Sequence, residues 1–150
     1  MKTIIIAEAG VNHNGSIDLA YKLVDLAVEA NADAVKFQTF VADNLVTKSA
    51  KKAGYQMESG DADESQYSML KRLELTKTEF SDLQGYCHDK GIDFLSTAFD
   101  QESLDFLYKD LKLGKLKIPS GELTNAPFVL EHARTGCDLI VSTGMADIEE

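Results

Sequence analysis

The chain has 150 residues, of which 44% are apolar and 27% charged, so it has room for about one domain of ordinary globular composition. Its 25 acidic and 15 basic residues give a net charge of −10, which argues against a general binder of nucleic acid or anionic membranes. No apolar run approaches the roughly 20 residues that span a bilayer, and the apolar stretch near the N-terminus is too short for a secretory signal. We expect a cytoplasmic protein in which Cys87 and Cys137 are reduced thiols.

The first half of the chain alternates between apolar runs and helical patterns. Residues 4–7 form a continuous apolar run, typical of a strand that is buried on both faces. After a polar loop, Ser16 can cap a helix in which Leu19, Leu23, Leu26 and Ala30 recur at helical spacing, with alanines and a valine beside them. A second strand is expected at residues 33–37. The long irregular stretch from about 41 to 65 is typical of a functional or mobile loop.

The second half repeats this alternation. In chain order, the expected elements are a short helix around residues 67–73, a helix with a capping box at Thr76–Glu79 that Gly91 ends, a strand at 92–96, a helix capped by Asp100, a strand at 115–118, a helix opened by Asn125 and Pro127, a strand at 138–142 and a helix start after Gly144.

Five strands that alternate with helices predict an α/β protein with a parallel sheet. Two architectures fit this order: an open doubly wound sheet, or the first part of an eight-stranded barrel. A complete (β/α)8 barrel needs about 250 residues, and the last residues resemble the opening turn of a helix. We therefore expect residues 1–150 to be the truncated N-terminal part of a longer protein.

Polar groups follow the expected strands at their carboxyl ends, where parallel α/β folds place their sites. Lys36 and Lys117 stand inside apolar strands, where a lysine must be paired or used. One interpretation is an internal ion pair with Glu8 or Glu122, and the other is a negatively charged ligand such as a phosphate or a carboxylate. Hydroxyls and backbone amides that suit phosphate oxygens follow the same strands, at Thr97, Ser120, Gly121, Ser142, Thr143 and Gly144.

Other classes of site are excluded or left open by the sequence. The chain has no GxxxxGK[ST] loop and no GxGxxG after the first strand, which excludes a P-loop nucleotidase and disfavours a dinucleotide site. A lysine at a strand end also suits a Schiff-base aldolase. For His13 we favour loop hydrogen bonding over substrate contact, and we expect His88 and His132 to lie at the surface of helices.

Four motifs in order resemble those of the sialic acid synthases, which condense phosphoenolpyruvate into nonulosonic acids. They are AEAGVNHNG at residues 7–15, VKFQTF at 35–40, KIPSGE at 117–122 and STGM at 142–145. The resemblance spans the whole chain. One departure is Ala98, where the family commonly has proline, and this departure removes no functional group.

The resemblance implies a (β/α)8 barrel, of which this chain covers roughly the first five βα units. It also implies a small antifreeze-like domain beyond residue 150, in a homodimer where that domain reaches the partner's site. A divalent metal, manganese or magnesium, is implied as well, with histidine ligands beyond residue 150. None of the three histidines here matches those ligands, so no metal ligand is assigned in this chain.

By motif position, the resemblance implies a role for eight residues. Phosphoenolpyruvate would be held by Lys36, Thr97, Lys117, Ser120 and Ser142. Glu8 would be a catalytic carboxylate near the reacting carbons, and Gln38 and Glu122 would face the sugar or order the site.

The implied reaction joins phosphoenolpyruvate, an N-acetylated hexosamine aldehyde and water, and it releases phosphate by C–O cleavage. The first expected acceptor is N-acetylmannosamine, which gives N-acetylneuraminate. The alternative is an N,N′-diacetyllegionaminate synthase acting on 2,4-diacetamido-2,4,6-trideoxymannose. Outside the family, the alternatives are a Schiff-base aldolase and a non-catalytic barrel fragment or sugar-binding module. The 150-residue piece by itself is expected to be inactive.

Overall fold

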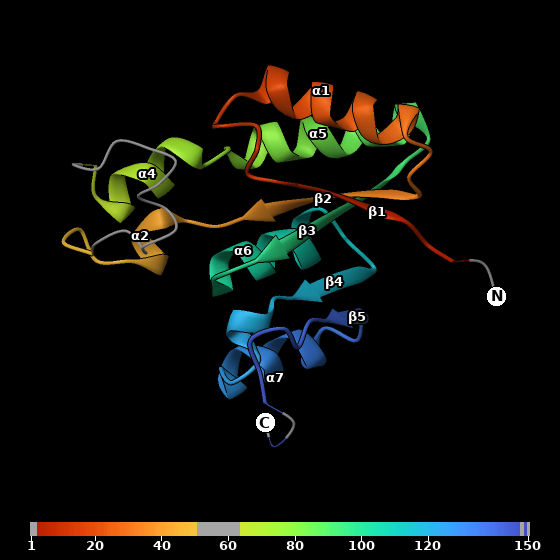
Figure 1. Cartoon of the computed structure of the whole chain (residues 1–150). Helices are drawn as coiled ribbons and strands as arrows, with labels where there is room; N and C mark the ends of the chain where they lie inside the picture. Colours follow the sequence, from red (N-terminus) through yellow and green to blue (C-terminus); the bar gives the residue numbers. More distant parts are fainter. Residues whose placement is uncertain (1–2, 51–63, 148, 150) are drawn as a thin grey trace.

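Five parallel strands form one sheet in the computed structural model, which describes residues 3–50, 64–147 and 149 (Figure 1). The strands are β1 (Ile6–Gly10), β2 (Ala34–Thr39), β3 (Asp93–Ala98), β4 (Lys115–Ile118) and β5 (Asp138–Val141). Their order in the sheet is their order in the chain. The predicted α/β alternation and parallel pairing are confirmed, while closure into a barrel stays a prediction.

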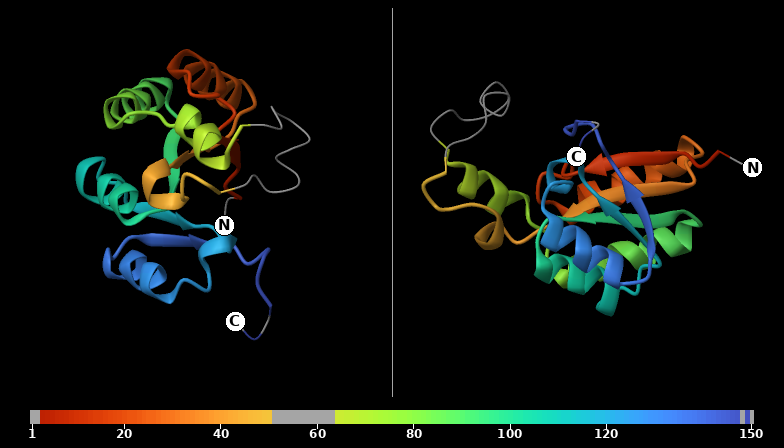
Figure 2. Two further views of the ribbon diagram at one scale, coloured as in Figure 1. Left: turned by 90° about the vertical axis from the view of Figure 1, so that its left-hand side faces the viewer. Right: turned by 90° about the horizontal axis from the view of Figure 1, so that it is seen from below.

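Helices α1, α5, α6 and α7 lie along one curved face of this sheet, as the left panel of Figure 2 shows, and α2 and α4 project beyond the carboxyl ends of the strands (Figure 1). The bounds are α1 (Ile17–Glu29), α2 (Ala42–Leu45), α4 (Gln66–Leu73), α5 (Lys77–Lys90), α6 (Gln101–Asp105) with its π-helical continuation η1 (Phe106–Asp110), the 3-10 turn η2 (Ser120–Glu122) and α7 (Ala126–Arg134). None of the described helices is both long and apolar enough to cross a membrane.

Local capping signals set several helix ends where the sequence predicts them. The Ser16 hydroxyl accepts the Leu19 N–H at the start of α1. Thr76 and Glu79 form a reciprocal capping box at the start of α5, and Gly91 ends that helix in the left-handed conformation at φ 73°. These contacts involve residues at most four positions apart, so the sequence alone is enough to predict them.

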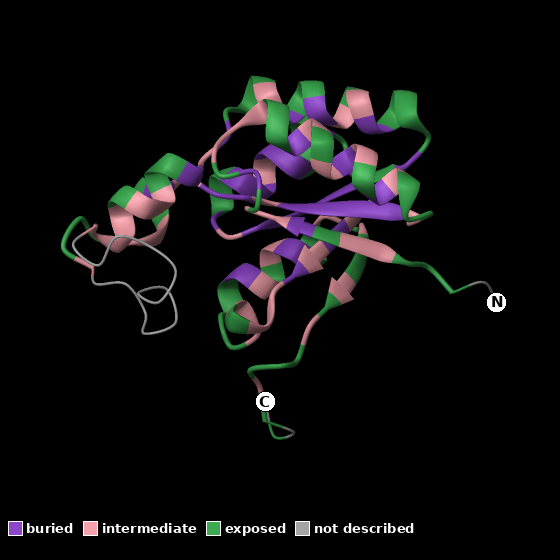
Figure 3. Cartoon of the chain, turned by 45° about the horizontal axis from the view of Figure 1, so that its top comes forward, coloured by how far each residue is buried: buried purple, intermediate pink, exposed green. Residues whose placement is uncertain are grey.

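The core lies between the helices and the sheet, where buried segments face each other (Figure 3). Val35 and Phe37 of β2 belong to it. Helix α1 packs there through Ala20, Val24 and Ala27, all buried. The leucines that define the predicted helical stripe are more exposed, with Leu26 at 59%. The smaller residues form the contact because they allow α1 to approach the sheet and α5 closely.

Two expectations need correction, and a third lies partly outside the described residues. The first strand begins at Ile6 rather than at residue 4, and Ile4 and Ile5 are exposed at the edge of the sheet, where β1 has a neighbouring strand on one side in the described structure. Residues 144–145 form a turn, and the helix start expected after Gly144, with its opening turn at 149–150, reaches residues that the structure does not describe. The stretch from 41 to 65 contains α2 instead of being wholly irregular, and residues 51–63 lie outside the described part.

Candidate active site

Five predicted site residues share the face of the sheet that points away from the helices. Side chains alternate along a strand, so two neighbours in sequence lie on opposite faces. The helix-facing positions are identified by core residues in each strand, namely Ala9, Phe37, Phe94 and Leu116. The alternate positions are Glu8, Lys36, Gln38, Thr97 and Lys117.

The register of the strands arranges these five residues in two adjacent rows. Glu8 is paired with Lys36 across β1 and β2. Two residues further along β2, Gln38 is paired with Thr97, and Thr97 is in turn paired with Lys117 of β4. Paired residues that are 20 to 59 positions apart in sequence therefore meet on one surface.

Lys36 is buried and forms an ion pair with Glu8. Its Nζ lies 2.6 Å from Glu8 Oε2, and the lysine is 7% exposed whereas the Glu8 side chain is 64% exposed. Of the two carboxylates considered as partners, Glu8 forms the pair, while Glu122 Oε2 accepts the Asn125 side-chain N–H at 2.8 Å. The pair compensates part of the cost of burying the ammonium, and its solvent-facing carboxylate can be displaced by another anion.

Lys117 is the second cation of this surface. Its Nζ donates to the Ile118 carbonyl at 3.0 Å. Burial lowers the pKa of Lys117, the charge of Lys36 lowers it further, and Glu8 acts in the opposite direction. The three charged groups therefore interact electrostatically, and a bound dianion would stabilise the protonated form of Lys117.

The remaining predicted residues follow β4 and β5. Ser120 and Glu122 belong to the turn η2 directly after β4. The Ser142 N–H donates to the Ile118 carbonyl at 3.1 Å, which places Ser142 beside the end of β4. Both serines thus stand at the carboxyl end of the sheet, next to the strand that carries Lys117.

Of the expectations for the three histidines, two are confirmed and one is wrong. His13 Nδ1 accepts the Gly15 N–H at 3.1 Å, which is the loop role we favoured. His88 is exposed, as expected, but His132 is completely buried, with Nδ1 3.0 Å from the Phe128 carbonyl and its ring edge-on to Phe128. His132 lies on the face of α7 that turns toward the sheet. The sequence pattern did not indicate this, because a polar residue was expected on the outer face of the helix.

The described residues do not fit a metal centre. Among them, no group of three or more histidine, cysteine, aspartate or glutamate side chains could hold a metal ion. The buried Nε2 atoms of His13 and His132 have no hydrogen-bond partner, and burial lowers the pKa of both rings. Neither of these imidazoles belongs to a group of three or more such side chains among the described residues.

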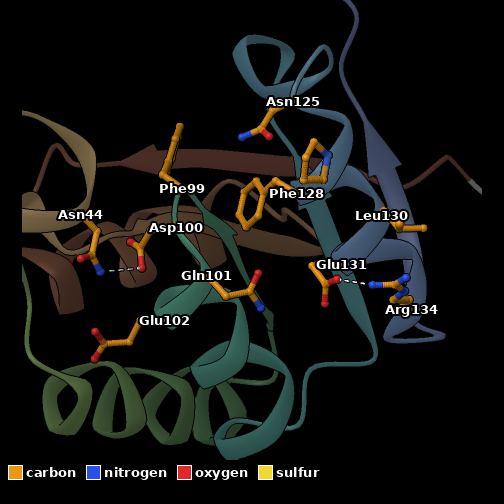
Figure 4. Close-up of a pocket in the computed structure, with 11 residues that line it drawn as sticks. Asn44, Phe99, Asp100, Gln101, Glu102, Asn125, Phe128, Leu130, Glu131 and Arg134 are labelled. Carbon is orange, nitrogen blue, oxygen red and sulfur yellow. Dashed lines mark hydrogen bonds and ion pairs between the residues drawn. The ribbon is translucent and has the colours of Figure 1, made fainter.

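A cavity of about 710 Å³ lies elsewhere, beside α7 and the segment that follows β3 (Figure 4). Its wall includes Asn44, Phe99, Asp100 and Phe128, and none of the eight predicted site residues lines it. Asp100 was recognised from the sequence only as a helix cap. Its further contacts involve residues of the β2 exit, which no local pattern connects to it.

Comparison with known proteins places this chain in a family. The profile of the NeuB family matches residues 23–150. The chain is 51% identical over its whole length to the N,N′-diacetyllegionaminic acid synthase of Legionella pneumophila, and 48% identical over 99% of its length to the Campylobacter jejuni enzyme of the same name.

A solved structure shows the same arrangement of elements. It is the N-acetylneuraminic acid synthetase of Leptospira borgpetersenii in complex with citrate, 31% identical with a TM-score of 0.78 over 98% of this chain and 47% of that one. The chain spans 42% of the Legionella protein and 44% of the Campylobacter protein, less than half the length of each.

Proposed function

The chain belongs to the NeuB family, and from this membership we propose that the protein condenses phosphoenolpyruvate with an N-acetylated amino-sugar aldehyde to form a nonulosonic acid and phosphate. The observation that supports this most directly is the surface on which Lys36 and Lys117 interact with each other and with Glu8. Two buried or half-buried ammonium groups beside a displaceable carboxylate suit a substrate that carries both a phosphate and a carboxylate.

In this proposal the lysines bind the phosphate, and the hydroxyls of Thr97, Ser120 and Ser142 supply further donors. C3 of phosphoenolpyruvate forms a bond to the aldehyde carbon, whose oxygen takes up a proton. Positive charge develops at C2, where a water adds and gives up one proton. The C2 hydroxyl then loses its proton as the C2–O bond to phosphate breaks, so that C2 becomes a ketone and the phosphate leaves with the bridging oxygen.

Glu8 is the candidate general base of this reaction. Its carboxylate is exposed, lies on the same face as both lysines and is held by Lys36 at 2.6 Å. When the phosphate binds the Lys36 ammonium, it competes with Glu8 for that charge. The Glu8 carboxylate can then turn toward the reacting carbons, where it stabilises the positive charge at C2 or accepts a proton of the water. Gln38 and Glu122 are proposed to face the sugar.

For the acceptor we propose 2,4-diacetamido-2,4,6-trideoxymannose. The support is similarity: identity is 51% and 48% to two N,N′-diacetyllegionaminic acid synthases, against 32% to the N-acetylneuraminate-9-phosphate synthase of Mus musculus. N-acetylmannosamine, the first expectation from the motifs, is the second candidate.

The larger assembly belongs to the same proposal. We propose a (β/α)8 barrel that includes these five strands, a cytoplasmic homodimer, and a divalent manganese or magnesium ion with ligands outside the described residues. The apolar residues Leu139 and Val141 of β5 support the barrel, because they stand on the helix-facing side of the sheet and are nevertheless exposed in the described part of the chain.

The test uses the full-length protein with manganese, phosphoenolpyruvate and each of the two sugars separately. Phosphate release and the mass of the sugar product are measured together. Phosphoenolpyruvate labelled with ¹⁸O in the bridging position distinguishes the bond that breaks, since C–O cleavage carries the label into phosphate. No release with either sugar, or label left in the organic product, contradicts the proposal.

Two further measurements separate the alternative classes. A Schiff-base aldolase is trapped covalently by borohydride in the presence of its carbonyl substrate, whereas the synthase is not.

A Lys117→Met variant is expected to lose phosphoenolpyruvate binding. The matched control is Lys115→Met, because Lys115 lies two residues earlier on the same strand and face but at the opposite end of β4.

A further inference from the structure

Asp100 connects two segments: the one that follows β2, called the β2 exit, and the one that follows β3, called the β3 exit. At the start of α6, Asp100 Oδ1 accepts the Ser103 N–H at 2.9 Å and Oδ2 accepts the Ser103 hydroxyl at 2.7 Å. The same carboxylate also reaches the segment that follows β2, where Oδ2 accepts the Val41 N–H at 2.9 Å. Oδ1 accepts the Asn44 side-chain N–H at 3.4 Å, the dashed line between these two residues in Figure 4. Asp100 is 8% exposed, so these four bonds satisfy a buried carboxylate.

The bond to Val41 is not needed for capping a helix. A serine or asparagine at this position can accept the Ser103 N–H just as well. The second carboxylate oxygen extends the connection between β2 and β3, whose backbone hydrogen bonding ends with the Phe99 N–H on the Thr39 carbonyl at 3.2 Å. Two residues beyond Thr39, at Val41, the backbone N–H is bound by the Asp100 side chain instead of by a backbone carbonyl.

The connected exits lie next to predicted substrate-binding residues. Gln38 and Thr97 are paired in register, and each precedes its contact by three residues, Val41 on one strand and Asp100 on the other. The cavity of about 710 Å³ opens beside Asp100, toward α7. The hydrogen bonds of Asp100 therefore connect the two exits at the wall of this cavity.

We propose that Asp100 is a positioning residue, which holds the β2 exit against the β3 exit through Val41 and so fixes the spacing of Gln38 and Thr97. This inference rests on the proposed synthase function. Charge-assisted bonds to backbone N–H groups are stronger than neutral ones and restrict the position of both partners. A displacement of about 1 Å at reacting groups can cost about 100-fold in rate.

The test compares two variants of the full-length protein. Asp100→Ser keeps a hydroxyl that caps α6 but is too short to reach Val41. Ser103→Ala removes one bond of Asp100 and leaves the Val41 bond in place. Hydrogen exchange of the Val41 amide reports the connection itself, while phosphate release and direct phosphoenolpyruvate binding report its consequence.

Asp100→Ser is expected to speed exchange at Val41 and to lower kcat by at least about 10-fold. The dissociation constant for phosphoenolpyruvate should change less, because Lys36 and Lys117 lie within strands whose backbone ladder is intact. Ser103→Ala should leave Val41 exchange and kcat within about twofold of the unmodified protein, since it removes only a contact inside the cap.

If Asp100→Ser does not fold, Asp100→Asn serves instead, because its amide keeps the size of the side chain but can accept from only one of the two backbone N–H groups. Equal kcat values for the Asp100 and Ser103 variants, or unchanged exchange at Val41, overturn the positioning role. Absence of phosphate release in the unmodified protein rejects the proposed function, and exchange at Val41 still shows whether the connection exists.

Discussion

Nζ of Lys36 lies 2.6 Å from Oε2 of Glu8, the residue directly opposite on the neighbouring strand. The lysine side chain is buried and the carboxylate is exposed, so the negative member of the pair is accessible to solvent and the positive member is not. In the proposed reaction, a phosphate that binds Lys36 competes with Glu8 for the ammonium, and the carboxylate stays beside the bound substrate. The proposal therefore couples substrate binding to a weaker hold of Lys36 on the candidate base.

Removing the charge of Glu8 separates its competition with the substrate for Lys36 from its proposed role as general base. Glu8→Gln should bind phosphoenolpyruvate at least as well as the unmodified protein, because Lys36 no longer has a competing carboxylate. Turnover should fall by about 100-fold or more, the usual contribution of a general base. Calorimetry and phosphate release measure the two effects, and Glu29→Gln, at an exposed position of α1, is the control for loss of one negative charge. Normal turnover of Glu8→Gln contradicts the role.

The affinity for phosphoenolpyruvate should depend on pH through Lys117. Burial and Lys36 lower the pKa of the free Lys117 ammonium, and a bound phosphate raises it again. Between the lowered pKa and the ordinary lysine value of about 10.4, binding takes up a proton, so affinity falls as pH rises. Calorimetry in buffers of different ionisation enthalpy measures this uptake. Lys117→Arg, which stays protonated, should abolish it; uptake that persists in this variant assigns the proton to another group.

Gly15 is required by a close approach rather than by its conformation alone. Its φ is 77°, and an added Cβ would lie 2.1 Å from the Arg72 carbonyl oxygen, whereas Gly91, at φ 73°, has open space around it. Gly91→Ala should therefore cost about 1–2 kcal/mol of unfolding free energy, from conformation alone. Gly15→Ala should cost about 1–3 kcal/mol more, the usual penalty of overpacking. Chemical denaturation compares them, and equal losses contradict the contact.

Stability should fall in mild acid because of His132. Burial lowers the pKa of this imidazole, so the unfolded chain takes up a proton near pH 6.5 that the folded protein does not. The stabilisation is fully present above that pH and is lost as pH falls, by at most about 1.4 kcal/mol per pH unit for one proton. His13, also buried, adds to the effect.

Unfolding free energies between pH 7 and 5 test this prediction. His132→Asn should flatten the pH dependence, since its side-chain N–H can still donate to the Phe128 carbonyl while the titrating group is gone. His88→Asn is the matched control at an exposed helical position and should leave the slope unchanged. A slope that survives in the His132 variant assigns the effect to His13 or to another group.

The order of elements and the ends of helices could be predicted from the sequence because their causes are local. The Ser16 cap, the Thr76–Glu79 capping box and the left-handed Gly91 each depend on residues within one helical turn. The lysines inside apolar strands likewise indicated a paired or anion-binding group before any fold was known.

The tertiary structure decided everything that depends on distant residues. Pairing in register brings Gln38, Thr97 and Lys117 into one row, and the choice of Glu8 over Glu122 as partner of Lys36 follows from which strands are neighbours. The burial of His132 and the reach of Asp100 to Val41 have the same origin. Sequence periodicity reports which face of an element is apolar, but it does not report which neighbour that face meets.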